Sequence, residues 1–294
     1  MRILITGLSG FLGQKLLSKL PADWEVVALS RSTLAAPPVV TQIKMDLTDA
    51  DAYRSLPSQI DAVLSLAQSR AYSVFPGQTG DVYDVNVTAS VRLADYAARA
   101  GAKSFTFFST GSVYEPYAKP LRETDMELAP RSLNGVSKLA AERALSLYRD
   151  IFPVCCLRPF FPFGPHQTRS IVPTLFERIN TGTAVQLDGK DGLTFSPVYV
   201  DDLINITVRA IEDHWRGAVN VAGLQTVTVR ELSEAIARAL GVEPVFSQSS
   251  SSALSLLPET DHLYSLYSPA SMTNFDDALS QTIASFRNRK APSI

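Results

Sequence analysis

The chain has 294 residues, of which 46% are hydrophobic and 19% charged, and its formal net charge is −2. This length allows a sizeable core in one or two domains, and the near-neutral charge argues against a nucleic-acid partner. The two cysteines, Cys155 and Cys156, are adjacent in an apolar run, which predicts buried thiols and neither a disulfide framework nor a metal site. The N-terminus enters a strand pattern at once, without a signal peptide or membrane span, so we expect a cytoplasmic protein with no membrane contact.

Short apolar runs alternate with segments of helical periodicity through the first half of the chain. The runs that predict strands are 2–6, 25–30, 41–45, 61–67, 103–109 and 153–158. The segments that predict helices between them are 11–20, 49–56 and 81–100, the last of which ends before Gly101. Strands separated by helices predict parallel βαβ units, and strands that are apolar throughout fit a sheet covered on both faces.

After about residue 160 the alternation of strands and helices becomes looser. We expect helices near 171–180 and 200–212 and a short strand near 184–187. Thr228 and Glu231 have the spacing of a capping box, and the Ser-rich segment 247–255 predicts a loop.

The whole pattern predicts an α/β protein with a doubly wound parallel sheet and a smaller C-terminal α/β domain. The first domain is expected at 1–165, with a return at about 196–222, and the smaller domain mainly at 166–294.

A glycine-rich turn, TGLSGFLG, lies directly between the first strand and the first helix. One glycine allows a tight turn, another lets a pyrophosphate approach the backbone, and a third lets the helix pack on the strand. The amides at the helix start then face the phosphates. The residues predicted to bind a dinucleotide here are Gly7, Gly10, Phe11, Leu12 and Gly13.

Several motifs resemble the extended short-chain dehydrogenases/reductases, the NAD(P)-dependent epimerase/dehydratase family. The glycine spacing is GxxGxxG, STGSVYE (109–115) resembles S-[ST]-x-x-V-Y-G, LRPFFPFGP (157–165) resembles LRxxNxYGP, and PVYVDDL (197–203) resembles xxYVDDL. The resemblance covers nearly the whole chain. It implies a Rossmann fold in which 1–165, with the return at about 196–222, is the dinucleotide-binding domain and 166–294 is mainly a substrate-binding lid. It implies an NAD(P)-dependent oxidoreductase, epimerase or dehydratase acting on a carbonyl or hydroxyl of a small-molecule substrate, and a possible homodimer through helices near 81–100 and 134–150. It also implies further cofactor-binding residues, namely Asp46, Leu47, Leu66, Ala67 and Lys138.

The second strand ends in LSRS and lacks the acidic residue that would bind the ribose 2′-hydroxyl of NAD. It offers Ser30 and Arg31 instead, and a hydroxyl with a guanidinium suits a 2′-phosphate. The sequence therefore favours NADP over NAD, while an ordinary solvated loop arginine is the alternative.

Family resemblance implies a catalytic set of Ser/Thr, Tyr and Lys. The lysine charge lowers the pKa of the tyrosine phenol, which exchanges a proton with the substrate oxygen while the Ser/Thr hydroxyl positions that oxygen. Thr110 and Lys138 occupy two of these positions, but Asn134 occupies the tyrosine position. An amide donates a hydrogen bond yet cannot transfer a proton near neutral pH.

Three explanations remain open for Asn134. A nearby group substitutes as proton donor, the protein is a catalytically silent NADP(H)-binding regulator or scaffold, or the change inactivates an enzyme. The candidates for a substitute donor lie on the loop before the helix and are Tyr114, Glu115, Tyr117 and Glu123.

The substrate positions also depart from the pattern of relatives that act on nucleotide sugars. Phe161 replaces the asparagine of LRxxNxYGP, and residues 239–286 contain no lysine or arginine. A diphosphate held without cations carries a large desolvation cost, so we expect a substrate other than an ordinary UDP- or dTDP-sugar. Arg169 and Lys190 are the cations that could still serve such a substrate. The predicted substrate-binding residues are Tyr114, Phe160, Phe161, Phe163, Arg169 and Phe195. For the four phenylalanines, core packing is the alternative.

Overall fold

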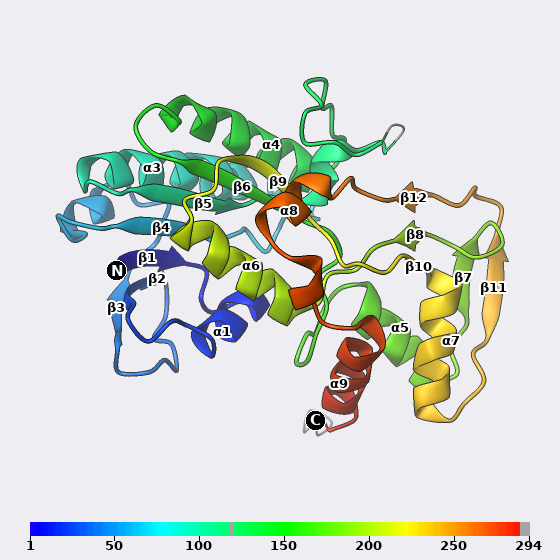
Figure 1. Cartoon of the computed structure of the whole chain (residues 1–294). Helices are drawn as coiled ribbons and strands as arrows, with labels where there is room; N and C mark the ends of the chain where they lie inside the picture. Colours follow the sequence, from blue (N-terminus) through cyan, green and yellow to red (C-terminus); the bar gives the residue numbers. More distant parts are fainter. Residues whose placement is uncertain (118–119, 289–294) are drawn as a thin grey trace. The chain divides into compact units, whose positions relative to one another are not determined.

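The computed structural model describes residues 1–117 and 120–288, and its main element is a seven-stranded sheet (Figure 1). The strands are β1 (Arg2–Thr6), β2 (Glu25–Ser30), β3 (Val40–Lys44), β4 (Ala62–Ser65), β5 (Ser104–Phe108), β6 (Val154–Pro159) and β9 (Gly217–Val221). Their order is β3-β2-β1-β4-β5-β6-β9, and the pairs from β3 to β6 are parallel. This order reverses at β1, so the predicted doubly wound α/β fold is confirmed.

Helices cover both faces of this sheet. Figure 1 shows α3 (Ala89–Arg99) and α4 (Leu133–Leu145) on one face, and α1 (Phe11–Leu17) and α6 (Val200–Glu212) on the other. The remaining short helices near the sheet are η1 (Asp51–Ser55), α2 (Thr79–Tyr83), η2 (Asp84–Thr88), η3 (Gly111–Tyr114) and η4 (Ser146–Tyr148). Because both faces are covered, every residue of β4 and β5 is buried, as their continuous apolar sequence predicts. The edge strand β3 is mostly exposed and correspondingly polar.

The chain divides into two compact units. The first consists of Met1–Pro116, Glu123–Pro159 and Ile204–Val219. The second consists of the described parts of Tyr117–Arg122, Phe160–Leu203 and Asn220–Ile294. The chain thus leaves the first unit after Pro159 and returns to it at Ile204, and the short excursion at Tyr117–Arg122 had no signal in the sequence.

The second unit contains a three-stranded and a two-stranded sheet. Its strands are β7 (Val185–Asp188), β8 (Thr194–Phe195), β10 (Val227–Thr228), β11 (Phe246–Ser249) and β12 (Ser255–Leu256). Its helices are α5 (Ile171–Asn180), α7 (Val229–Leu240), α8 (Asp261–Leu266), η5 (Pro269–Ser271) and α9 (Phe275–Arg287).

Two local predictions in this unit have different outcomes. The capping box is confirmed, because the Thr228 side chain accepts from the amide of Glu231 while the Glu231 carboxylate accepts from that of Thr228. The loop prediction for 247–255 is wrong at both ends, where β11 pairs with β7 and β12 pairs with β8. Backbone pairing holds these short edge strands, so their serine side chains gave no strand signal. Among the described residues, no helix combines the length and apolarity needed to cross a membrane.

Candidate functional site

The glycine turn follows β1 and lies against the segment that follows β4. Gly7 has a φ of 79°, in the left-handed region that favours glycine. A Cβ on Gly7 would lie 2.7 Å from the amide nitrogen of Ala67 and 2.7 Å from the carbonyl carbon of Leu66. The Ala67 amide donates to the hydroxyl of Thr6 at 3.1 Å. The structure therefore brings together the turn and the strand end that were predicted to border the cofactor.

Gly13 and Gly10 have different surroundings within the turn. A Cβ on Gly13 would lie 2.4 Å from the Cα of Leu8, so α1 can pack on the turn only with glycine there. Gly10 has an ordinary φ of −84°, and its Cβ would meet only the Gly7 carbonyl oxygen, at 3.4 Å. The fold does not require glycine at position 10, whereas a pyrophosphate close to the backbone would. This open space fits the predicted dinucleotide. The other two residues predicted here, half-buried at the start of α1, are Phe11 and Leu12.

The residues predicted to contact the adenosine end lie beyond β2 and β3. The Ser30 hydroxyl donates to the carbonyl of Ser32 at 2.5 Å, and Arg31 is exposed. The Asp46 carboxylate accepts from the amide and the hydroxyl of Thr48, at 2.9 and 2.8 Å. These bonds, and to a smaller extent the charge of Arg31, lower the pKa of Asp46. Because Arg31 is exposed, its guanidinium is accessible to a 2′-phosphate. The last residue predicted here, partly buried against the core, is Leu47.

Thr110 and Asn134 face each other where β5 ends and α4 begins. The Thr110 hydroxyl oxygen accepts from the Ser112 amide at 3.2 Å, and the Asn134 side-chain nitrogen lies 3.4 Å from it. The Asn134 side-chain oxygen is buried and has no hydrogen-bond partner among the described residues. A buried acceptor without a donor is costly, so a bound group with a donor is expected beside it.

The local sequence explains how α4 reaches Thr110. Ser132 caps the helix, since its hydroxyl accepts from the Gly135 amide at 3.1 Å. A Cβ on Gly135 would lie 2.5 Å from the Ser112 carbonyl oxygen. Glycine at this position therefore allows the close approach that places Asn134 next to Thr110.

Lys138 lies one turn after Asn134 and is 1% exposed. Its ammonium donates to the carbonyl of Phe108 at 2.7 Å and lies 4.6 Å from the ring centre of Phe107. Burial lowers the pKa of Lys138 from 10.5 to about 7, and the charge of Glu142 opposes this shift. Because its side chain is buried, Lys138 is not a solvated lysine on the surface of α4.

We expect the free energy of unfolding to rise with pH between about 7 and 10.5 relative to a Lys138→Met variant. In this window the unfolded chain binds a proton that the folded chain has released, so increasing pH favours the folded state. Below the window both states are protonated and the difference is constant. The slope should approach about 1.4 kcal/mol per pH unit. Urea unfolding at several pH values would measure it, and a flat difference would show that Lys138 titrates near its ordinary pKa.

Asn86 connects the segment that follows β4 to α4. It is fully buried on η2, a π-helical turn, and its side-chain oxygen accepts from the Ser69 amide at 3.0 Å. Its side-chain nitrogen donates to the hydroxyl of Ser137, the residue before Lys138, at 3.0 Å. The sequence analysis gave no role to Ser137.

A buried ion pair that the sequence analysis missed joins α4 to β6. The Arg158 guanidinium donates to both carboxylate oxygens of Glu142, at 3.0 and 2.5 Å. The Ser109 hydroxyl donates to the same carboxylate, and Arg158 also donates to the Tyr114 hydroxyl at 2.7 Å. The charge of Arg158 within an apolar run was the available signal, because such a residue is rarely buried without a partner.

This arrangement bears on the candidate proton donors. Tyr114 is 5% exposed and its hydroxyl is held by Arg158. The Glu115 carboxylate accepts from the amides of Arg131 and Ser132, at 2.9 and 2.6 Å, and so supports the start of α4. Both side chains therefore have structural partners. The other two candidates, both partly exposed, are Tyr117 and Glu123.

The predicted substrate-binding phenylalanines lie in the second unit. Phe160, Phe163 and Phe195 are each at most 2% exposed, which is the burial expected of core packing. Phe161 is half-buried, has a φ of 45°, and its ring centre lies 4.6 Å from that of Phe195. A bulky residue in the left-handed region is uncommon. Arg169 is exposed. Within the described ranges, no group of three or more His, Cys, Asp or Glu could hold a metal ion.

The sequence model of the NAD dependent epimerase/dehydratase family matches residues 3–222 of this chain. A UDP-glucose 4-epimerase of Mycolicibacterium smegmatis is 33% identical over 84% of this chain and 85% of its own. A dTDP-4-dehydro-6-deoxy-D-allose reductase of Streptomyces bikiniensis is 26% identical, over 81% of each chain. Among solved structures, the UDP-glucuronic acid 4-epimerase of Bacillus cereus in complex with NAD has a TM-score of 0.83 at 20% identity, over 98% of this chain and 99% of its own.

Proposed function

The chain belongs to the NAD-dependent epimerase/dehydratase family, and we propose that it transfers a hydride at a hydroxyl or carbonyl carbon of a sugar-like small molecule. Its relatives are named as epimerases, dehydratases and reductases, so this is a family of enzymes. The observation that carries the proposal is the cluster of Thr110, Asn134 and Lys138, which lies in the same unit as the glycine turn.

Thr110 and Asn134 would hold the substrate oxygen. The Thr110 oxygen already accepts two bonds from nitrogen, so its proton is available to a ligand, and the buried Asn134 oxygen needs a donor. One donor beside one acceptor suits an alcohol hydroxyl, which can satisfy both. When bound, the nicotinamide would supply the hydride donor or acceptor.

We propose Lys138 as the atypical proton donor of the unaltered chain, less effective than a phenol because its ammonium also donates to the Phe108 carbonyl at 2.7 Å. Position 134 offers no phenol for its charge to activate, and burial brings the lysine pKa to about 7, where protonated and neutral forms are both populated at neutral pH. Lysines used as general acids or bases have pKa values lowered in this way. We therefore expect turnover to be lost in Lys138→Met. In the unaltered protein the turnover rate should depend on pH near neutrality, where Lys138 titrates.

We propose NADP as the preferred dinucleotide. The absent acid after β2 and the exposed guanidinium of Arg31 support this choice. Solved relatives from Bacillus cereus and Bordetella bronchiseptica are named with NAD, so NAD is the alternative.

We propose that the substrate carries no nucleoside diphosphate, although relatives are named for UDP- and dTDP-sugars. Two of the described arginines of the second unit already have acidic partners. Arg122 lies 2.6 Å from Glu259, and Arg230 lies 3.1 Å from Asp191. No lysine or arginine occurs at 239–286, so an incoming diphosphate would meet little compensating charge there.

Calorimetric titration separates these proposals. NADP and NAD are titrated first, and UDP-glucose and dTDP-glucose are then added at saturating dinucleotide. We expect tighter binding of NADP and no measurable binding of the nucleotide sugars, followed by turnover of a neutral sugar or alcohol in a nicotinamide absorbance screen. Micromolar binding of either nucleotide sugar would refute the substrate class, and absence of dinucleotide binding would refute the function itself.

Asn134 favours a second function, a catalytically silent protein that binds NADP(H) and regulates or scaffolds a partner. That reading predicts dinucleotide binding with no turnover in the same screen.

A further inference from the structure

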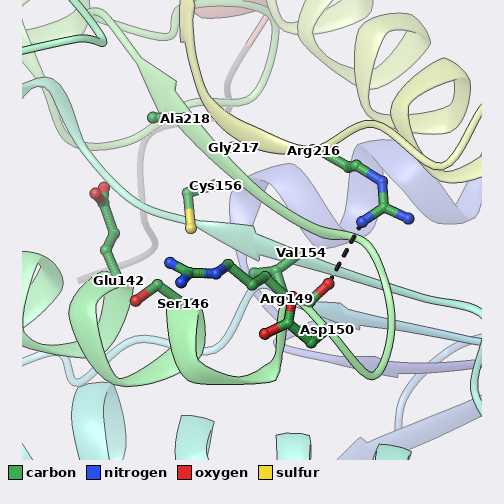
Figure 2. Close-up of a pocket in the computed structure, with 9 residues that line it drawn as sticks. All are labelled: Glu142, Ser146, Arg149, Asp150, Val154, Cys156, Arg216, Gly217 and Ala218. Atoms are coloured by element: carbon green, nitrogen blue, oxygen red, sulfur yellow. Dashed lines mark hydrogen bonds between the residues drawn. The ribbon is translucent and has the colours of Figure 1, made fainter.

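A cavity of about 450 Å³ lies beside the C-terminal end of α4, within the first unit (Figure 2). Its volume falls in the range of small-molecule sites, about 300–1,000 Å³. Val154, Cys156 and Ala218 provide an apolar surface, and the first two are at most 7% exposed. Exposed polar residues of the loops after α4 and before β9 also line it.

This cavity is separate from the dinucleotide cradle. Val154 and Gly217, which line it, are the first residues of β6 and β9. The glycine turn instead follows the last residue of β1. Amino ends and carboxyl ends of parallel strands lie at opposite edges of a sheet, and cofactors bind at the carboxyl edge. A ligand in the cavity would therefore serve neither as cofactor nor as the substrate of the cluster at Thr110.

Two arginines give the cavity its charge. Figure 2 shows the Arg149 guanidinium directed past Ser146 toward Glu142, and no ion pair or side-chain hydrogen bond holds it among the described residues. Arg216 donates to the backbone carbonyl of Arg149 at 3.4 Å and leaves its other donors available. Asp150 offsets one of these charges.

The remaining charged residue of the lining is already neutralised. The Glu142 carboxylate is paired with the buried Arg158, which is not one of the residues that line the cavity. Two arginines and one aspartate then leave the lining with a net charge of +1. A monoanion matches this charge, and a planar carboxylate matches the fork of a guanidinium.

We propose that this cavity binds a small organic carboxylate with an apolar body. The carboxylate binds Arg149 and Arg216, and the body packs on Val154, Cys156 and Ala218. This proposal is independent of the hydride-transfer function, because it uses none of the residues assigned to the cofactor or to the reacting oxygen.

The test is calorimetric titration of the full chain with naphthoate, carried out without dinucleotide and again at saturating NADP, which fills the dinucleotide cradle. Naphthamide, the neutral isostere, is the ligand control. We expect naphthoate to bind, and naphthamide to bind at least about tenfold more weakly because it lacks the charge-assisted hydrogen bonds.

Variants locate the site. Arg149→Gln should weaken naphthoate binding by about tenfold or more, whereas Arg143→Gln, an exposed arginine of α4 outside the lining, should leave it unchanged. Ala218→Leu should also weaken it by filling part of the cavity. Equal binding of naphthoate and naphthamide, displacement of naphthoate by dinucleotide, or an Arg149→Gln protein that binds like the unaltered chain would each overturn the proposal.

Discussion

Replacing Gly10 by valine should lower the affinity for NADP and NAD by at least about a hundredfold while leaving the fold intact. The backbone at Gly10 has a φ of −84°, which any residue can adopt, and the added Cβ would meet only one protein atom, at 3.4 Å. The free energy of unfolding should therefore change by no more than about 1 kcal/mol, the range of an altered N-cap. The valine would occupy the space that the pyrophosphate needs against the backbone. Calorimetric titration and urea unfolding measure the two effects.

Gly80 offers a matched control for this substitution. It lies in α2, its φ is outside the left-handed region, and a Cβ there would meet no atom within 4 Å. Gly80→Val should keep full dinucleotide affinity. If Gly10→Val bound NADP as tightly as the control, the pyrophosphate would have to lie elsewhere, and the functional proposal would lose its premise.

The sheet could be predicted from the sequence because burial on both faces imposes an unbroken apolar run on each central strand. The runs 2–6 and 25–30 coincide with β1 and β2. The glycines of the turn were equally predictable, because a positive φ at Gly7 and the close approach at Gly13 exclude other residues. The Ser-rich strands β11 and β12 were missed because their backbone pairing does not depend on side-chain character.

Tertiary contacts of the candidate site were predictable only in part. Motif position placed Thr110, Asn134 and Lys138 in one set, but it could not show that Lys138 is fully buried against the Phe108 carbonyl. That burial depends on residues distant in sequence, as does the Glu142 ion pair. Sequence reasoning treats each charged residue as solvated unless a partner is named, and the partners here come from other elements.

The chain departs from the family pattern at one position in each unit. In the first, Asn134 removes the ionisable phenol beside Thr110. In the second, Phe161 takes a left-handed conformation at a position where the family has asparagine, a residue that adopts it more readily. Strain of this kind persists only where surrounding structure enforces it, here the contact with Phe195. Together the two changes support the proposal of altered chemistry and an altered ligand on the scaffold of the family.

Replacing Asn134 by tyrosine should raise the rate of hydride transfer by up to about 10²–10⁴, the contribution of a positioned general acid or base, because a phenol beside Thr110 would take over from the less effective Lys138. The new phenol would stand one helical turn before Lys138 and opposite the Thr110 hydroxyl, which accepts from the present amide at 3.4 Å. It would also remove the buried amide oxygen that lacks a partner. The measurement is nicotinamide absorbance at fixed saturating dinucleotide, with the substrate identified by screening.

Asn134→Phe separates the phenol hydroxyl from the space that its ring occupies. Both variants insert the same ring next to Gly135, so any loss from crowding is common to them, and only tyrosine restores a group that can exchange a proton. A gain confined to Asn134→Tyr would show that Thr110, Lys138 and the cradle form a site ready for hydride transfer. If the tyrosine variant folds and binds dinucleotide but shows no gain over phenylalanine, the cluster does not hold a reacting oxygen. The silent-binding function would then be the better description of this chain.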